Sequence, residues 1–198
     1  MGKLSMHPTS TASWQALVLE AQTASHIELN EDLQSYLVFL LMRFIHEVKL
    51  DQKPLALDFL ETIHQKGKLQ QNSLREVGDK CLIVSGFFPG LAERRLVEIK
   101  YFVSLGQGAY TSLSQLTHEK SSAHLFSDLS YGFVALMDIL QTMREMSSDE
   151  PLLNPLMAAE LYVDTGSVHA LNNLRRAGLL EPHQGGNRSR FIKIFTRQ

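Results

Sequence analysis

Apolar residues recur at helical spacing along most of the chain, and one run is clearer than the others. In that run they follow the i, i+3, i+4, i+7 rule throughout: Leu33, Tyr36, Leu37, Leu40, Leu41, Phe44, Ile45 and Val48. Val38, Phe39 and Met42 add apolar surface beside this face, so we expect the helix to be nearly surrounded by protein. The pattern therefore predicts that the helix from Leu33 to Val48 lies at the centre of the core.

The same periodicity predicts helices before and after this segment. They cover about residues 10–21, 54–64, 73–85, 91–105, 123–146, 152–163 and 168–179. Ser73 and Glu76 form a Ser-x-x-Glu capping box, which predicts a helix start at Ser73. Gly106 and Gly108 weaken the helix that follows residue 91, where they mark a bend or a close approach of the chain. The predicted fold class is all-α, an orthogonal or irregular bundle of about seven or eight helices.

The chain divides into a main bundle and a smaller extension. We expect residues 1–147 to form the bundle and residues 148–198 to form a helical extension on the same core, ending in a short basic arm. Residues 151–198 carry six Lys or Arg against three Asp or Glu, whereas the whole chain has a net charge of −2. The tail is therefore the one candidate surface for an anionic macromolecule.

The composition is that of a globular, cytoplasmic protein. The apolar share is 44%, and the longest apolar run, Tyr36 to Met42, is far shorter than the roughly 20 residues of a membrane-spanning helix. The first residues, MGKLSMHPTSTAS, lack the apolar core of a secretory signal. Cys81 is the single cysteine, which excludes an internal disulfide and favours a reducing compartment. We expect no membrane partner.

No catalytic or metal-binding constellation stands out. Glu61 and His64 resemble half of a di-iron ligand set, but no second Glu-x-x-His pair exists, and two solvated side chains explain the first. Cys81 lies between apolar residues, where it behaves as a small hydrophobic side chain. The Gly106-Gln107-Gly108 run has no strand before it, so it does not fit a dinucleotide-binding loop. We expect no metal and no cofactor, and we favour a protein without enzymatic activity.

Unusual residues are most concentrated between Gly78 and Thr111, where an arginine pair follows a Pro-Gly break. Helix N-termini attract anions, and guanidinium groups bind carboxylate or phosphate through two parallel hydrogen bonds. The pattern suggests a site for a small anionic ligand or a protein partner near the Gly86–Pro89 break. The candidate residues are Asp79, Ser85, Arg94, Arg95, Tyr101 and Tyr110.

A purely structural alternative stays open for the same charges. Arg94, Glu98 and Tyr101 fall at i, i+4 and i+7 of a predicted helix, so Arg94 can pair with Glu98. Arg95 can pair with Asp79 across the break. Charged clusters are often only ion pairs, so a ligand role and an internal role are both consistent with the sequence.

The C-terminal segment VHALNNLRRAGLLEPHQGGNRSRFIKIF offers a second hypothesis. It resembles the last helix and wing of winged-helix DNA-binding domains, in which the wing contacts phosphate. The residues that would contact nucleic acid are Arg175, Arg176, Arg188, Arg190 and Lys193. Residues Asp164 to Ser167 would form the turn of such a domain, but the spacing from this turn to Leu171 is a residue short. The alternative is an ordinary capping helix followed by a solvated basic tail.

The central stretch is similar to an uncharacterised bacterial family of helical proteins, in which a Gly-Asp element and a Ser-Gly-Phe-Phe-like element precede an arginine pair. The matching residues are Gly78, Asp79, Ser85, Gly86, Phe87, Phe88, Arg94, Arg95, Tyr101, Gly106, Ala109 and Tyr110. The resemblance extends more loosely to Met146 and to Thr165-Gly166-Ser167. It implies a bacterial, cytoplasmic protein. The family has no established activity, so the resemblance implies no site residues.

Three classes of function follow from these observations. The leading expectation is a non-catalytic helical module that binds a small anionic ligand or a protein partner near Arg94 and Arg95. The first alternative is a DNA-binding regulator that uses the C-terminal helix and wing. The second is an enzyme of unknown class, which requires a closed polar pocket. A homodimer is compatible with each of them.

Overall fold

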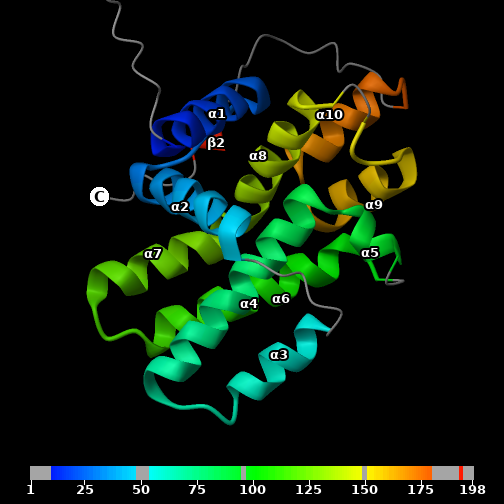
Figure 1. The fold of residues 1–198 in the computed structure, drawn as a ribbon. Coiled ribbons are helices and arrows are strands. Elements are labelled where there is room, and N and C mark those ends of the chain that lie inside the picture. Colours follow the sequence, from blue (N-terminus) through cyan, green and yellow to red (C-terminus); the bar gives the residue numbers. More distant parts are fainter. Residues whose placement is uncertain (1–9, 48–53, 95–96, 149–150, 180–191, 194–198) are drawn as a thin grey trace, which may run out of the picture.

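Helices form almost all of the regular structure. The computed structural model describes residues 10–47, 54–94, 97–148, 151–179 and 192–193 (Figure 1). Within these ranges the helices are α1 (Ser10–Ser25), α2 (Glu31–Glu47), α3 (Leu55–Thr62), α4 (Gly67–Phe87), α5 (Gly90–Arg94), α6 (Ile99–Leu116), α7 (Lys120–Tyr131), α8 (Phe133–Met146), α9 (Pro155–Thr165) and α10 (Val168–Arg176). The prediction of an all-α, multi-helix fold is confirmed, with ten described helices rather than seven or eight.

Two short strands add a minor element. The strand β1 (Ile27–Glu28) pairs in parallel with β2 (Ile192–Lys193), so that Ile27 lies opposite Ile192. The basic arm predicted at the C-terminus therefore contributes a strand beside the end of α1. The rest of that arm lies outside the described residues. No described helix has both the length and the hydrophobicity needed to cross a membrane.

The centre of the bundle is α4, which packs along α6 on one side and along α8 on another (Figure 1). Its residues from Cys81 to Gly86 are all buried. The prediction that the helix from Leu33 to Val48 is central is wrong. Helix α2 packs mainly against α1 and α7, and Phe39 is 59% exposed, so the helix is not surrounded by protein. Val48 lies outside the described residues.

Three predicted helix boundaries differ from the structure. Helix α4 begins at Gly67, where φ is +62°, so the Ser73 capping box lies inside the helix. No helix-breaking residue separates Lys68 from Ser73, and the helix therefore extends back to the glycine turn. The helix predicted for residues 123–146 divides into α7 and α8 at Gly132, whose ψ of 3° turns the chain.

The helix predicted from residue 91 onward is also divided. Helix α5 ends at Arg94, and α6 begins at Ile99 after an extended Glu98 (ψ 153°). Between them the N–H of Val97 donates to the carbonyl of Ala92 over 3.0 Å, which closes a turn. Arg94 and Glu98 therefore do not lie on one helical face as predicted.

Three glycines allow the central helices to approach closely. A Cβ atom at Gly78 would meet the ring of Tyr110, and one at Gly86 would meet Leu140. At Gly106 a Cβ would overlap the ring of Phe133 and lie 2.9 Å from the Cβ of Cys81. Side chains, rather than another backbone, therefore come close at Gly106, whereas a Cβ at Gly108 would have no neighbour within 4 Å. The predicted bend is absent, since α6 continues without a break to Leu116.

Replacing Gly106 with alanine is expected to destabilise the protein by about 2 kcal/mol, because the methyl group overpacks the contact between three helices. Gly108→Ala is the matched control on the same helix, since a Cβ there has no neighbour within 4 Å. It is expected to leave stability unchanged or raise it by up to about 1 kcal/mol. Urea unfolding of both variants measures the difference, and equal stabilities would contradict the packing described here.

Candidate functional site

A polar cluster in the core surrounds Asp79 on α4, which is only 2% exposed. The hydroxyl groups of Tyr36 from α2 and Tyr110 from α6 each donate to its Oδ1 over 2.6 Å. Arg43 of α2 forms an ion pair with Oδ2. Nε of Arg75 lies 3.7 Å from Oδ2 and donates to the hydroxyl oxygen of Tyr36 over 3.2 Å. One carboxylate thus connects α2, α4 and α6.

These contacts decide what the cluster can do chemically. Burial, and next the negative charge of Asp79, raise the pKa of Tyr36 and of Tyr110 well above the ordinary value, so both phenols remain hydrogen-bond donors. Both oxygens of Asp79 already accept from fixed partners, so this carboxylate has no free position for a substrate proton. The cluster is therefore suited to holding helices together rather than to acid–base chemistry.

The structure does not bring the six candidate residues together. Asp79 and Tyr110 meet, but Ser85 is fully buried and donates to the carbonyl of Cys81. Tyr101 is half-buried, with its ring 5.1 Å from that of Phe102. Arg94 is exposed on α5, and no described residue forms an ion pair with it. Arg95 lies outside the described residues, and the described cations at Asp79 come from α2 and α4.

Sequence reasoning missed three members of this cluster, namely Tyr36, Arg43 and Arg75. A signal was present for each. Arg75 precedes Asp79 by four residues on one helix, which is the spacing of an ion pair. Tyr36 and Arg43 are seven residues apart, so they share a face of α2, where apolar neighbours suggested only packing.

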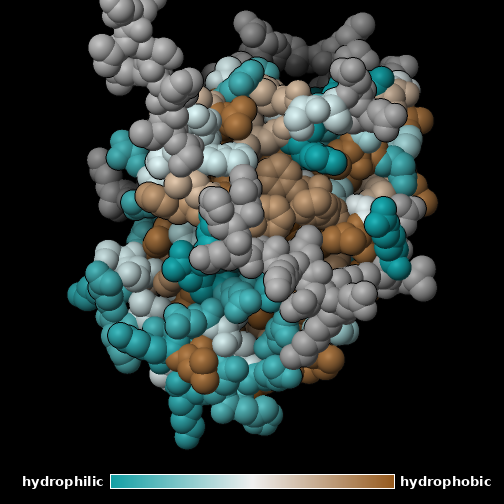
Figure 2. Space-filling model, viewed as in Figure 1, coloured by the Kyte–Doolittle hydropathy of each residue, from teal (hydrophilic) through white to brown (hydrophobic). Residues whose placement is uncertain are grey.

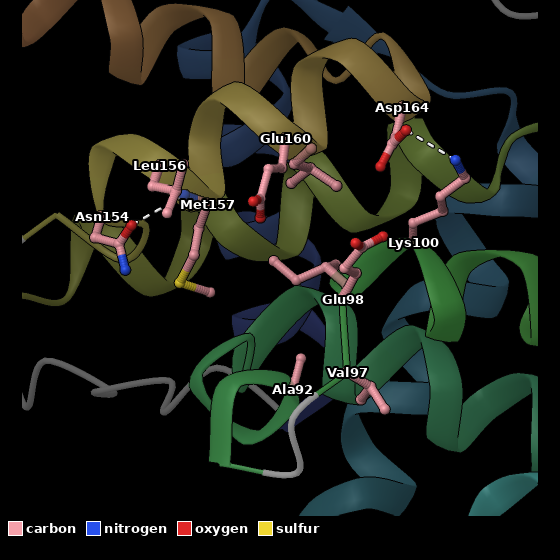
Figure 3. Close-up of a pocket in the computed structure, with 11 residues that line it drawn as sticks. Ala92, Val97, Glu98, Lys100, Asn154, Leu156, Met157, Glu160 and Asp164 are labelled. Atoms are coloured by element: carbon pink, nitrogen blue, oxygen red, sulfur yellow. Dashed lines mark hydrogen bonds and ion pairs between the residues drawn. The ribbon is translucent and has the colours of Figure 1, made fainter.

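A groove lies beside the start of α6, close to the predicted break. It has a volume of about 200 Å³ and is bounded by α9, the N-terminus of α6 and the connection from α5 (Figure 3). Its apolar lining comes from Ala92, Val97, Ile99, Leu156, Met157 and Leu161. We call this the α9 groove.

Acidic side chains surround the α9 groove. The carboxylates of Glu98 and Glu160 both point into the space between α9 and α6 (Figure 3). Neither forms a hydrogen bond or an ion pair with another described residue. Nζ of Lys100 donates to Asp164 over 2.8 Å, and this bond raises the pKa of the lysine. Among the described residues, the lining therefore carries three carboxylates and one cation, and that cation is already engaged.

A second polar cluster fixes α10 on α8. Asp138, which is buried, accepts from the hydroxyl of Ser167 over 2.5 Å and from the N–H of Val168 over 2.7 Å. Glu145, two turns further along α8, contacts Nε2 of His169 at 3.1 Å and Arg176 at 2.7 Å. Burial raises the pKa of Asp138 to about 6, although these hydrogen bonds oppose the increase.

Of the five basic residues of the predicted DNA-binding surface, the structure describes the side chains of Arg175 and Arg176 alone. Both are exposed, and Arg176 forms an ion pair with Glu145. The first turn of α10 is buried against α8, and this turn is the part of a recognition helix that reads base edges. Arg188 and Arg190 lie outside the described residues, and Lys193 belongs to β2, but its side chain is not described. The described part of the chain therefore gives the DNA-binding hypothesis no support.

Comparison of the chain with protein-family models, with curated proteins and with solved structures finds no match. The resemblance to a bacterial family of helical proteins stays a prediction.

The Asp79 cluster predicts a graded loss of stability. Asp79→Asn removes the charge that both arginines face and is expected to cost about 3 kcal/mol. Tyr110→Phe removes one of several donors and is expected to cost about 1 kcal/mol. Tyr162→Phe, an exposed tyrosine, should change stability by less than about 0.5 kcal/mol. Chemical denaturation measures all three, and an Asp79→Asn variant as stable as the wild type would contradict the role of this carboxylate.

The lowered pKa of Glu145 predicts that the protein loses stability in acid. Burial alone would raise its pKa, but hydrogen bonds from His169 and Arg176 outweigh it and lower the pKa to about 2 from 4.5. Because the folded-state pKa is the lower one, the stabilisation is complete above pH 4.5 and disappears as the pH falls toward 2. The difference in unfolding free energy between wild type and Glu145→Gln should therefore shrink over this range. A difference that is independent of pH from 7 to 2 would contradict it.

Proposed function

We propose that this protein is a non-catalytic docking module that binds a basic, partly apolar segment of a partner protein in the α9 groove. The observation that supports this most strongly is the pair of carboxylates, Glu98 and Glu160, that face an apolar-lined groove without bonding to a described cation. Such a groove offers apolar area for affinity and charge for orientation.

The sign of the charge selects the class of occupant. With three carboxylates against one engaged lysine, the α9 groove repels a phosphate or a carboxylate and attracts Lys or Arg side chains. A small anion, which the Arg94–Arg95 pair suggested, is therefore a poor ligand for this groove. A basic segment would place its cations near Glu98 and Glu160 while its apolar side chains contact Ile99 and Met157.

The outer surface of α9 extends the groove. Leu156, Glu160 and Val163 share one face of the helix, and the two apolar side chains are 68% and 81% exposed. Exposed apolar side chains beside a charged rim are typical of interaction surfaces. The groove alone holds about 200 Å³, which suits one or two side chains, so the neighbouring face supplies the rest of the contact.

Binding of a synthetic Lys/Leu amphipathic peptide tests this proposal, with a Glu/Leu peptide of the same length as the control. The Lys/Leu peptide should bind and the Glu/Leu peptide should not, and salt should weaken the binding. The double variant Glu98→Lys/Glu160→Lys should reduce the affinity at least about tenfold, which corresponds to about 1.4 kcal/mol. For each single variant, Glu98→Lys or Glu160→Lys, the charge-matched control is Glu20→Lys on α1, which makes the same charge change away from the groove and should retain full affinity. Fluorescence anisotropy measures these affinities.

Several outcomes would overturn the proposal. Equal binding of the two peptides would show that the carboxylates do not select the occupant, as would equal loss of affinity in the single groove variants and in Glu20→Lys. Sedimentation of the double variant gives a further criterion. If Glu98→Lys/Glu160→Lys turns a wild-type dimer into a monomer, the occupant is a second copy of this chain rather than another protein.

A further inference from the structure

A second groove lies on a different part of the molecule, between the first turns of α4 and the first turns of α7. It has a volume of about 490 Å³, and Leu113 and Thr117 at the C-terminal end of α6 form part of its lining. We call this the α4–α7 groove. The lower part of the face shown in Figure 2, over the starts of these helices, is mostly hydrophilic. None of its lining residues is shared with the α9 groove.

One wall of the α4–α7 groove carries two cations on a single helical face. Lys68 and Arg75 are seven residues apart on α4, and Gln71 and Asn72 lie between them on the same side. The amide of Gln71 is already used, since it donates to the carbonyl of Leu116 over 2.8 Å. Lys68 is exposed and forms no ion pair with a described residue.

Arg75 is held in place before any ligand arrives. Its Nε donates to the hydroxyl oxygen of Tyr36, and its guanidinium lies 5.2 Å from the centre of the Tyr36 ring. Burial would lower the pKa of Arg75, but its interactions with Tyr36 and Asp79 outweigh this and raise it. The recorded hydrogen bond uses Nε alone, so the terminal amino groups carry four further N–H donors. A fixed guanidinium fork loses little entropy when it binds an oxyanion.

The opposite wall and the floor complete the lining. His118 and Ser122 lie across the groove from α4, and Leu113 and Phe126 supply apolar surface. One carboxylate is present, that of Glu119. It accepts from the hydroxyl groups of Ser121 and Ser122 over 2.9 and 2.8 Å, so its charge is shared with two local donors. Among the described residues, the lining thus has two permanent cations against one carboxylate, and one of the cations, Arg75, also faces the buried Asp79.

We infer that the α4–α7 groove is a binding site for a small organic oxyanion that carries a flat apolar group. The guanidinium of Arg75 and the ammonium of Lys68 would bind the oxyanion, and the flat group would lie against Phe126 and Leu113. Phosphate monoesters and carboxylates share this chemistry. Two cations and one fork suit the higher charge of the phosphate monoester. This site is separate from the docking proposed for the α9 groove and does not depend on it.

Phenyl phosphate is the probe, and isothermal titration calorimetry in 0.15 M salt is the measurement. Phenyl phosphate should bind saturably, with at least about fivefold higher affinity than inorganic phosphate, because only the ester reaches the apolar floor. Lys68→Glu should reduce this affinity at least about tenfold. It places an acidic residue in the first turn of α4, where the helix dipole favours it, so the fold should be retained. Lys120→Glu makes the same charge change in the first turn of α7, outside the lining, and should change the affinity less than twofold.

One further variant and one further ligand complete the test. Arg75→Lys keeps the positive charge but removes the fork, and it should weaken phenyl phosphate at least about fivefold. Benzoate distinguishes the two oxyanions, and it should bind more weakly than phenyl phosphate. The inference would be overturned if neither phenyl phosphate nor benzoate binds saturably. Equal effects of Lys68→Glu and Lys120→Glu would overturn it too, since the response would then report only the net charge of the protein. Tighter binding of benzoate would overturn the preference for phosphate.

Discussion

The buried charge of Asp79 is the constraint on which the arrangement of the bundle depends. An isolated carboxylate inside a protein is costly unless hydrogen bonds and opposite charges surround it. Here two tyrosine hydroxyls and two arginines satisfy it, and they come from α2, α4 and α6. Because all of these partners are needed at once, the three helices are fixed in one relative placement. A purely apolar contact would allow them to slide.

Close approach of side chains to the backbone at two glycines also fixes how the helices lie relative to one another. Gly78 lies directly beside the ring of Tyr110, so the residue preceding Asp79 allows the tyrosine hydroxyl to reach the carboxylate. Gly106 does the same for Phe133, which positions α8 against α6. The two grooves are consequences of this framework. Arg75 reaches the α4–α7 groove from the Asp79 cluster, and the start of α6 forms one side of the α9 groove.

The sequence predicted the fold class well because helical periodicity is a local property. It predicted the positions of the helices within the bundle less well. The run containing Phe39 is the most regular in the chain, yet regular spacing indicates an amphipathic helix and not its depth, and α2 lies at the side of the bundle. The Ser73 capping box was misleading for a related reason, since a favourable cap acts only where the helix has not already begun at Gly67.

The candidate site also shows that local sequence patterns do not report contacts between distant segments. Asp79 and Tyr110 were recognised as unusual, and they do meet, but their partners on α2 were hidden within an apolar run. The α9 groove joins residues near 98 to residues near 160, and no local pattern reports a contact between segments so far apart. The arginine pair lies in the chain between Ala92 and Val97, two residues that line the α9 groove, but the carboxylate that α9 contributes there is visible only in three dimensions.

Two grooves of opposite charge on one rigid framework should bind opposite ligands, and backbone amide chemical-shift mapping by NMR tests this most directly. One labelled sample is titrated separately with the Lys/Leu peptide and with phenyl phosphate. The account predicts that the peptide shifts amides of α9 and the start of α6, whereas phenyl phosphate shifts amides of the first turns of α4 and α7. Shifts of the same residues by both ligands, or shifts spread over the whole bundle, would contradict it.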